Sequence, residues 1–107
     1  METLTIQLQA PQPARGRRAM AIVGVVGSGD LEVLAERVLA AEECHLEIST
    51  AIAGFGPVWQ AVARDFVERR SPGGVRFSIN DGGARPDIVA IRLAQAARLI
   101  EEDQPCT

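Results

Sequence analysis

One serine of this chain has neighbours that suit covalent chemistry. Ser28 lies between Gly27 and Gly29, is followed by Asp30, and comes directly after an apolar run over residues 20–26. Glycine and aspartate predict a tight turn, and a turn between apolar strands holds its side chain out in solvent. The two glycines have no Cβ atom, so a large group can approach the serine hydroxyl from several directions. The segment therefore suits a serine that enters another protein's active site and is modified there, with Asp30 as a nearby carboxylate.

Other roles for the same segment need residues that this chain does not supply at the right spacing. A serine hydrolase needs a base beside its nucleophile, but the single histidine, His45, falls on the polar face of a predicted strand. The G-x-S-x-G pattern of a nucleophile elbow is missing as well. A phosphate-binding loop would need a lysine, and the chain has none. The alternative that stays open is an unmodified hairpin turn, because Gly-Ser-Gly is short and common.

Composition indicates one small globular domain over residues 1–107, with a disordered tail from about residue 103. Apolar residues make up 47% of the chain and aromatic residues only 4%, which predicts a mostly aliphatic core. The net charge is −3, which disfavours a nucleic-acid partner. Cys44 and Cys106 match no zinc or redox spacing. We find no signal peptide and no membrane span, and therefore expect a cytoplasmic protein with no membrane partner and no metal site.

Hydrophobic periodicity predicts the elements that position Ser28. Apolar and polar residues alternate as in half-buried strands over residues 3–9, 45–52 and 75–80. Residues 20–26 are a short, strongly apolar and β-branched run, which also favours a strand. Residues 31–37 fit either a strand, by their alternation, or a helix that Asp30 could cap. Proline followed by helical spacing predicts helices over residues 57–70 and from residue 86 to near the end. Because the strands come first, we expect an α+β fold, an antiparallel or mixed sheet of about five strands with two helices packed on one face.

A basic stretch precedes the serine. Arg15, Arg17 and Arg18 fall in the Pro- and Gly-containing segment 10–18, which predicts a loop. These arginines are either a solvated loop or a docking strip for an acidic partner, or for the phosphates of a bound arm. The sole tryptophan, Trp59, is predicted to lie in the core rather than in a contact surface.

Beyond these patterns, the chain resembles a known family along nearly its whole length. It is similar to the acyl carrier subunit, or delta subunit, of bacterial malonate decarboxylase, and more distantly to the acyl carrier subunit of citrate lyase. It departs from the family pattern at residues 38–44, where Val-Leu-Ala-Ala-Glu-Glu-Cys stands in place of a Gly/Pro-type turn. The most specific match is Gly-Ser-Gly-Asp-Leu-Glu-Val, and the matching segments are residues 1–4, 12–16, 26–34, 59–60, 79–86 and 89–93.

The resemblance implies a non-catalytic carrier. In that family a phosphoribosyl-dephospho-CoA group is joined to the serine of this segment by a phosphodiester bond, which implies Ser28 as the attachment site. The arm would carry acetyl and malonyl thioesters between an acyl transferase subunit and a decarboxylase subunit. A prosthetic-group transferase and a malonyl transferase would be further partners. The resemblance also favours a strand over residues 31–37. The residues alone leave malonate or citrate open as the substrate, and an unmodified adaptor or assembly module is the alternative from another class.

Overall fold

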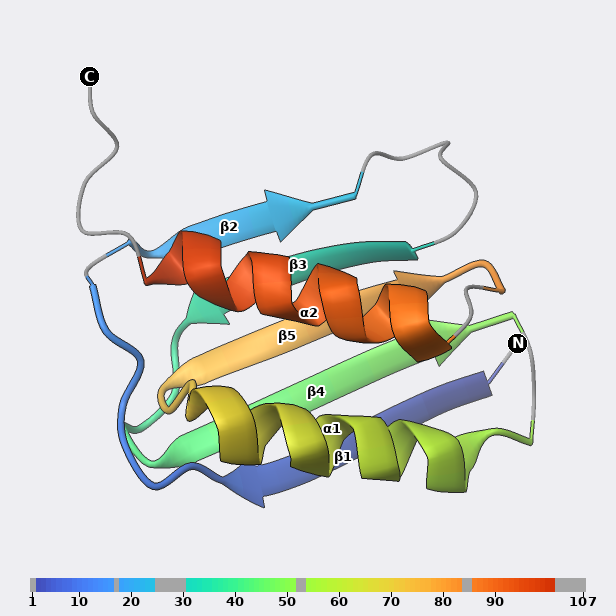
Figure 1. The fold of residues 1–107 in the computed structure, drawn as a ribbon, viewed down its shortest axis with the longest axis horizontal. Coiled ribbons are helices and arrows are strands. Elements are labelled where there is room, and N and C mark those ends of the chain that lie inside the picture. The colour runs from blue at the N-terminus through green and yellow to red at the C-terminus, as the bar shows by residue number, and fades with distance from the viewer. Residues whose placement is uncertain (1, 17, 25–30, 52–53, 84–85, 102–107) are drawn as a thin grey trace.

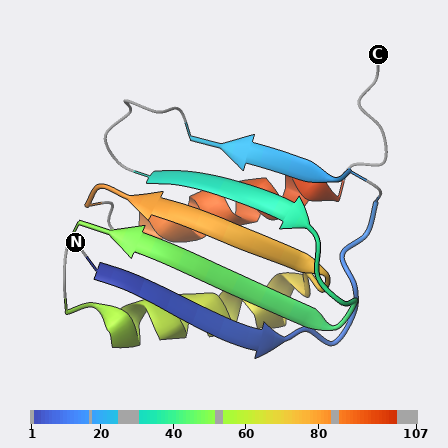
Figure 2. The ribbon, with the colours of Figure 1, turned by 180° about the vertical axis from the view of Figure 1, so that it is seen from behind.

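A mixed five-stranded sheet carries both helices of the protein on one face (Figure 1). The computed structural model describes residues 2–16, 18–24, 31–51, 54–83 and 86–101. Seen from behind, the other face of the sheet is covered by neither helix (Figure 2). The predicted α+β architecture is therefore confirmed. The elements are β1 (Glu2–Gln9), β2 (Met20–Val23), β3 (Leu31–Arg37), β4 (Glu43–Thr50), α1 (Gly56–Arg70), β5 (Val75–Asp81) and α2 (Pro86–Ile100).

The strand order is β1-β4-β5-β3-β2, so β2 and β1 form the two edges of the sheet. Strands β4 and β5 run parallel and are joined through α1, while the other neighbouring pairs are antiparallel. The register gives the sheet two distinct ends. We call one the hairpin end, a row made by Glu2, Thr50, Asp81 and Leu31. The opposite row, which we call the far end, contains Leu8, Cys44, Val75 and Arg37.

Residues 31–37 form strand β3, which confirms the strand prediction and excludes the helix. Leu31, Val33 and Ala35 are buried on the helix-covered face, and the residues between them are less buried. This period of two fits a strand that has a packed face and an open face. The same seven residues pair with the whole of β5, so β3 lies inside the sheet and not at its edge.

The core lies between the sheet and the two helices. Phe66 of α1 packs edge-on against Phe77 of β5, with ring centroids 5.1 Å apart and an interplanar angle of 84°. Trp59 is buried, as predicted. Two members of the predicted helical stripes are exposed instead, Val58 by 41% and Ile91 by 52%. Each helix packs with one side against the sheet and against its neighbouring helix. Apolar residues on the opposite side of the helix, such as these two, are therefore left exposed.

Element boundaries differ from the predicted ones by a few residues. The structure begins β4 at Glu43 and continues β5 to Asp81, whereas the predicted strands began at residue 45 and ended at residue 80. Strand β5 runs longer because Asp81 pairs with partners on both sides. The segment between β3 and β4 turns without Gly or Pro, through a backbone hydrogen bond of 2.9 Å from Glu43 N–H to the Ala40 carbonyl. The departure from the family pattern there thus still forms a closed turn.

Candidate functional site

The predicted carrier serine belongs to the connection between β2 and β3 at the hairpin end. Residues 25–30, and with them Ser28, Gly27, Gly29 and Asp30, lie outside the described part of the chain. The described residues on either side are Gly24 and Leu31. Strands β2 and β3 are antiparallel neighbours, with Val23 opposite Val33, so the segment joins an edge strand to the next strand inward.

Gly24 fixes how the chain leaves β2. Its φ is +88°, in the region that residues with a Cβ rarely adopt. A Cβ atom at this position would overlap the carbonyl oxygen of Leu31 and lie 3.2 Å from the Cα atom of Glu32. The backbones of the two strands thus approach so closely at the base of the serine segment that only glycine fits. The sequence pattern alone assigned Gly24 no role of this kind.

A buried carboxylate closes the sheet beside Leu31. Asp81 is only 8% exposed, and its Oδ2 accepts a hydrogen bond of 2.7 Å from the Thr50 hydroxyl. Its Oδ1 accepts one of 3.0 Å from the N–H of Gly83. The ends of β4 and β5 and the following turn are therefore locked together next to the first residue of β3. The sequence contained a signal for this buried pair. Thr50 and Asp81 are polar residues at strand positions where the alternation otherwise places apolar, core-facing residues.

The buried cysteine of the chain does not provide a reactive thiol. Cys44 is 0% exposed and free of any disulfide, on the helix-covered side of β4. Burial raises the pKa of its thiol from 9.0 to about 12, because the charged thiolate is poorly solvated there. Nucleophilic sulfur chemistry requires the thiolate, so Cys44 is inert at neutral pH. The second cysteine, Cys106, lies outside the described residues.

The predicted basic strip lies at the far end. Arg15 and Arg18 are described, whereas Arg17 is outside the described residues. The guanidinium of Arg37, the last residue of β3, donates to the carbonyls of Arg18, Ala14 and Arg15 at 2.9–3.0 Å. Because β3 spans seven residues, this loop lies about 20 Å along the strand from Leu31, the first described residue after the serine segment. Arg15 and Arg18 therefore lie at the opposite end of β3 from Leu31.

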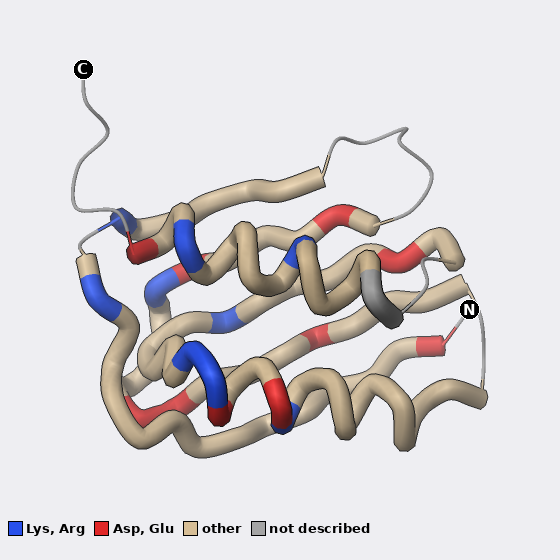
Figure 3. Tube along the Cα trace, in the orientation of Figure 1, with Lys and Arg blue, Asp and Glu red and all other residues tan. Residues whose placement is uncertain are grey.

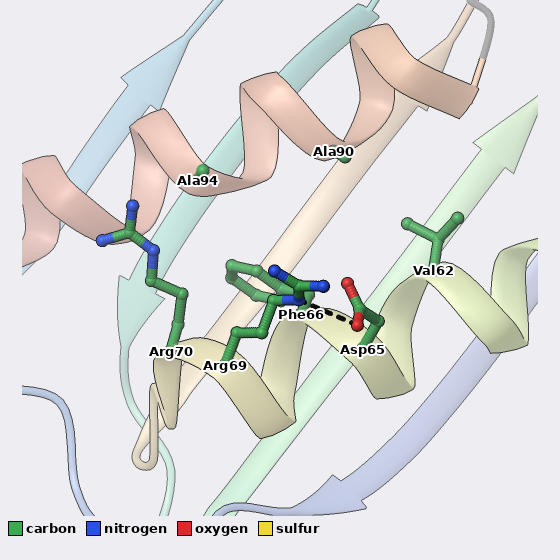
Figure 4. A pocket seen from close by; sticks show the side chains of 7 residues that line it. All are labelled: Val62, Asp65, Phe66, Arg69, Arg70, Ala90 and Ala94. Atoms are coloured by element: carbon green, nitrogen blue, oxygen red, sulfur yellow. Dashed lines mark hydrogen bonds and ion pairs between the residues drawn. The ribbon is translucent and has the colours of Figure 1, made fainter.

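A groove between the two helices is the other feature that could accept a ligand. It has a volume of about 480 Å³ and is lined by Val62, Asp65, Phe66, Arg69, Arg70, Ala90 and Ala94 (Figure 4). Asp65 and Arg69 form an ion pair of 2.9 Å on its α1 side. The described lining has no serine, threonine, cysteine or histidine, and its single carboxylate, Asp65, is held in the ion pair with Arg69. His45 lies on the open face of the sheet, where it contacts Glu43 at 3.3 Å.

Comparison with known proteins places the chain in a class of acyl carrier subunits. Residues 18–100 match the family described as malonate decarboxylase delta subunit (MdcD). The chain is 60% identical over 103 residues to the malonate decarboxylase acyl carrier protein of Bradyrhizobium diazoefficiens, covering 96% of this chain and 98% of the relative. Identity to the protein of the same description from Burkholderia cepacia is 52% over 97 residues, with 91% and 88% covered. The chain belongs to the malonate decarboxylase acyl carrier (delta subunit) family.

A solved structure agrees with this assignment. The fold is similar to a chain in the crystal structure of a Pseudomonas malonate decarboxylase hetero-tetramer in complex with malonate. The TM-score is 0.80 and the sequence identity 37%, with 94% of this chain and 99% of that chain covered.

Proposed function

We propose that this chain is the acyl carrier subunit of a malonate decarboxylase, and that Ser28 holds its prosthetic arm. The observation that carries the proposal is that the Gly-Ser-Gly-Asp segment joins edge strand β2 to β3, at one end of the fold, in a member of this family. A modifying enzyme has to reach the serine from outside, and an edge connection suits that approach. Gly27 and Gly29 leave space around the hydroxyl, and Asp30 provides a carboxylate beside the phosphodiester.

The proposed prosthetic group is phosphoribosyl-dephospho-CoA. When bound it supplies a thiol that carries acetyl and malonyl groups as thioesters. The residues of this chain fit such an arm, because the serine offers an oxygen for the phosphodiester and Cys44 keeps its own thiol buried and protonated. A buried thiol neither attacks a thioester on the arm nor forms a disulfide with its thiol.

The other subunits of the decarboxylase are the proposed partners. One acyl transferase subunit would exchange acetate for malonate on the arm, and another subunit would decarboxylate the malonyl group. A prosthetic-group transferase would load Ser28, and a malonyl transferase could charge it. The contribution of the carrier is effective concentration, because a tethered substrate stays near each active site. The family assignment supports malonate over the citrate alternative.

We place the carrier in the cytoplasm, together with the proposed arm donor and the partner subunits. Within the described part of the chain, neither helix is long and apolar enough to cross a membrane. We further propose that Arg15, Arg17 and Arg18 form a docking strip for a partner subunit. Arg15 and Arg18 lie at the far end of the sheet, so a subunit bound there leaves the hairpin end uncovered.

Intact mass spectrometry tests the proposal. Protein purified from its own host should be heavier than the sequence mass by one phosphoribosyl-dephospho-CoA group, and fragmentation should place the added mass on Ser28. The Ser28→Ala variant should fold normally and gain nothing, whereas the control Ser78→Ala, on the open face of β5, should be loaded like the natural chain. An added mass on Ser28→Ala would show that the site is wrong. A bare protein in cells growing on malonate would favour the adaptor alternative.

A further inference from the structure

We propose that a basic hollow at the far end is the docking site for an acidic segment of a partner subunit of the decarboxylase; this rests on the proposed carrier function. The hollow has a volume of about 290 Å³. Three parts of the chain that are far apart in sequence meet there, namely the loop after β1, the end of α1 and the residue that follows α2. Its lining residues are Gln12, Pro13, Arg15, Arg69, Arg70, Ser71 and Glu101.

Hydrogen bonds hold the loop against the end of α1. The Ser71 hydroxyl donates to the Gln12 carbonyl at 2.9 Å and accepts from the Gln12 N–H at 2.7 Å. Next to this pair, Ala14 N–H donates to the Gly73 carbonyl at 2.9 Å. From the other side, the Arg37 guanidinium binds the Arg15 carbonyl at 2.9 Å. The backbone that carries Arg15 is thus fixed before any partner arrives, which lowers the entropy lost on binding.

Two arginines of the hollow, Arg15 and Arg70, are available to bind an anionic partner. Arg69 is paired with Asp65, but no carboxylate of the described residues forms an ion pair with Arg15 or Arg70. Glu101 lines the same hollow without such a pair. Arginines in the last turn of α1 also complement the helix dipole, which gives Arg69 and Arg70 a structural use. That effect does not account for Arg15, which lies in a loop and is brought to the helix end by the contacts at Ser71.

The position of the hollow suits a carrier. Several arginine segments gather at this end, where β3 and both helices terminate (Figure 3). The serine segment leaves the sheet at the other end of β3. A subunit that holds the far end would therefore lie at the opposite end of β3 from Leu31, where the serine segment joins the sheet, and the arm could reach an active site while the carrier stays bound.

Carboxylate side chains are the matching chemistry. A guanidinium presents a planar fork of donors that binds a carboxylate with two parallel hydrogen bonds. Two such forks without an ion pair, held on a fixed backbone, fit an Asp- or Glu-rich segment of a protein. Nucleic acid is a poorer match, because the net charge of the chain is −3 and only 4% of its residues are aromatic.

The test is binding of the loaded, full-length carrier to the remaining decarboxylase subunits, co-purified from the same host without this chain. We expect Arg15→Glu and Arg70→Glu each to raise the Kd by about tenfold or more, because like charges would then face each other. The neutral variants Arg15→Gln and Arg70→Gln should weaken binding less and make it less sensitive to salt. Arg64→Glu, an exposed position of α1 outside the hollow, is the matched control and should stay within about twofold of the natural chain.

Other results would overturn the docking site without touching the carrier function. Equal Kd values for the Arg15, Arg70 and Arg64 variants, with circular dichroism showing all of them folded, would exclude the hollow as the contact. Backbone chemical shifts around Arg15 that move when the arm is loaded, in the absence of partner subunits, would assign the hollow to the phosphates of the arm. Arg15→Glu should raise the Kd by the same factor in the Ser28→Ala background as in the loaded carrier. If the natural chain, purified from its own host, lacked the added mass of the prosthetic group, the proposed carrier function itself would be contradicted.

Discussion

Replacing Gly24 with alanine should damage the base of the serine segment far more than an ordinary glycine substitution does. A residue with a Cβ at a φ of +88° carries a strain of about 1–3 kcal/mol. The added methyl group would also overlap the Leu31 carbonyl, a backbone atom that cannot rotate away. Strands β2 and β3 would have to separate locally, and we assign this overpacking a further cost of about 1–3 kcal/mol. Gly24→Ala should therefore lower the free energy of unfolding by roughly 2–6 kcal/mol.

Gly54 provides the matched control, because its φ of +94° is similar but, among the described residues other than its chain neighbours, no atom lies within 4 Å of the position of its Cβ. Gly54→Ala should show the conformational strain alone. In urea denaturation, an extra loss of about 2 kcal/mol corresponds to a midpoint lower by roughly 1 M. The fraction of protein loaded with the arm, measured by intact mass, should fall for Gly24→Ala and not for Gly54→Ala. Equal midpoints and equal loading for the two variants would refute the argument that close strand approach shapes the serine segment.

Two further variants test the far end and the core. The Arg37 guanidinium donates to four backbone carbonyls, among them that of Ile100 at 2.7 Å. Arg37→Met should therefore lower the free energy of unfolding by roughly 3–4 kcal/mol. Arg37→Lys should restore only part of the lost stability. A loss no greater than that of Arg64→Met, measured by urea denaturation, would contradict this role. For Cys44, the pKa of the thiol is about 12 in the folded chain and near 9 in the unfolded chain. As the pH rises above 9, the thiol of the unfolded chain therefore loses its proton first. The free energy of unfolding should fall between pH 9 and pH 12, by up to roughly 4 kcal/mol. Cys44→Ala should remove that part of the pH dependence; an unchanged slope would show that the thiol is not the cause.

Local patterns were sufficient for most of the elements because each depends on neighbouring residues. Proline before a helical stripe at residue 57 acts within a few residues, and the predicted helix is present. Alternation over residues 31–37 left a strand and a helix both open, and the family resemblance favoured the strand that is observed. Boundaries were less accurate, because the last pairs of a strand depend on its partners. Strand β5 continues to Asp81 since Leu31 and Thr50 lie on either side of it, and neither neighbour is close in sequence.

The features of the candidate site also differ in whether neighbouring residues or distant contacts determine them. The serine segment was recognised from four adjacent residues and from a family resemblance, and it remains a prediction because residues 25–30 lie outside the described structure. The glycine that shapes its base was missed as a structural requirement, since its φ and its approach to Leu31 depend on how two strands pair. The basic strip was predicted as three neighbouring arginines, whereas the hollow combines Arg15 with Arg69 and Arg70.

The sequence by itself determined most of the strands and helices, the presence of one glycine-bordered serine, and the family. Those properties follow from residue types and from short spacings, which survive in any arrangement of the elements. Only the tertiary structure decided that β5 lies between β4 and β3, that burial raises the pKa of Cys44, and that arginines from two distant segments line one hollow. These features depend on contacts between residues far apart along the chain, whose energies are set by the packing of the whole sheet against both helices.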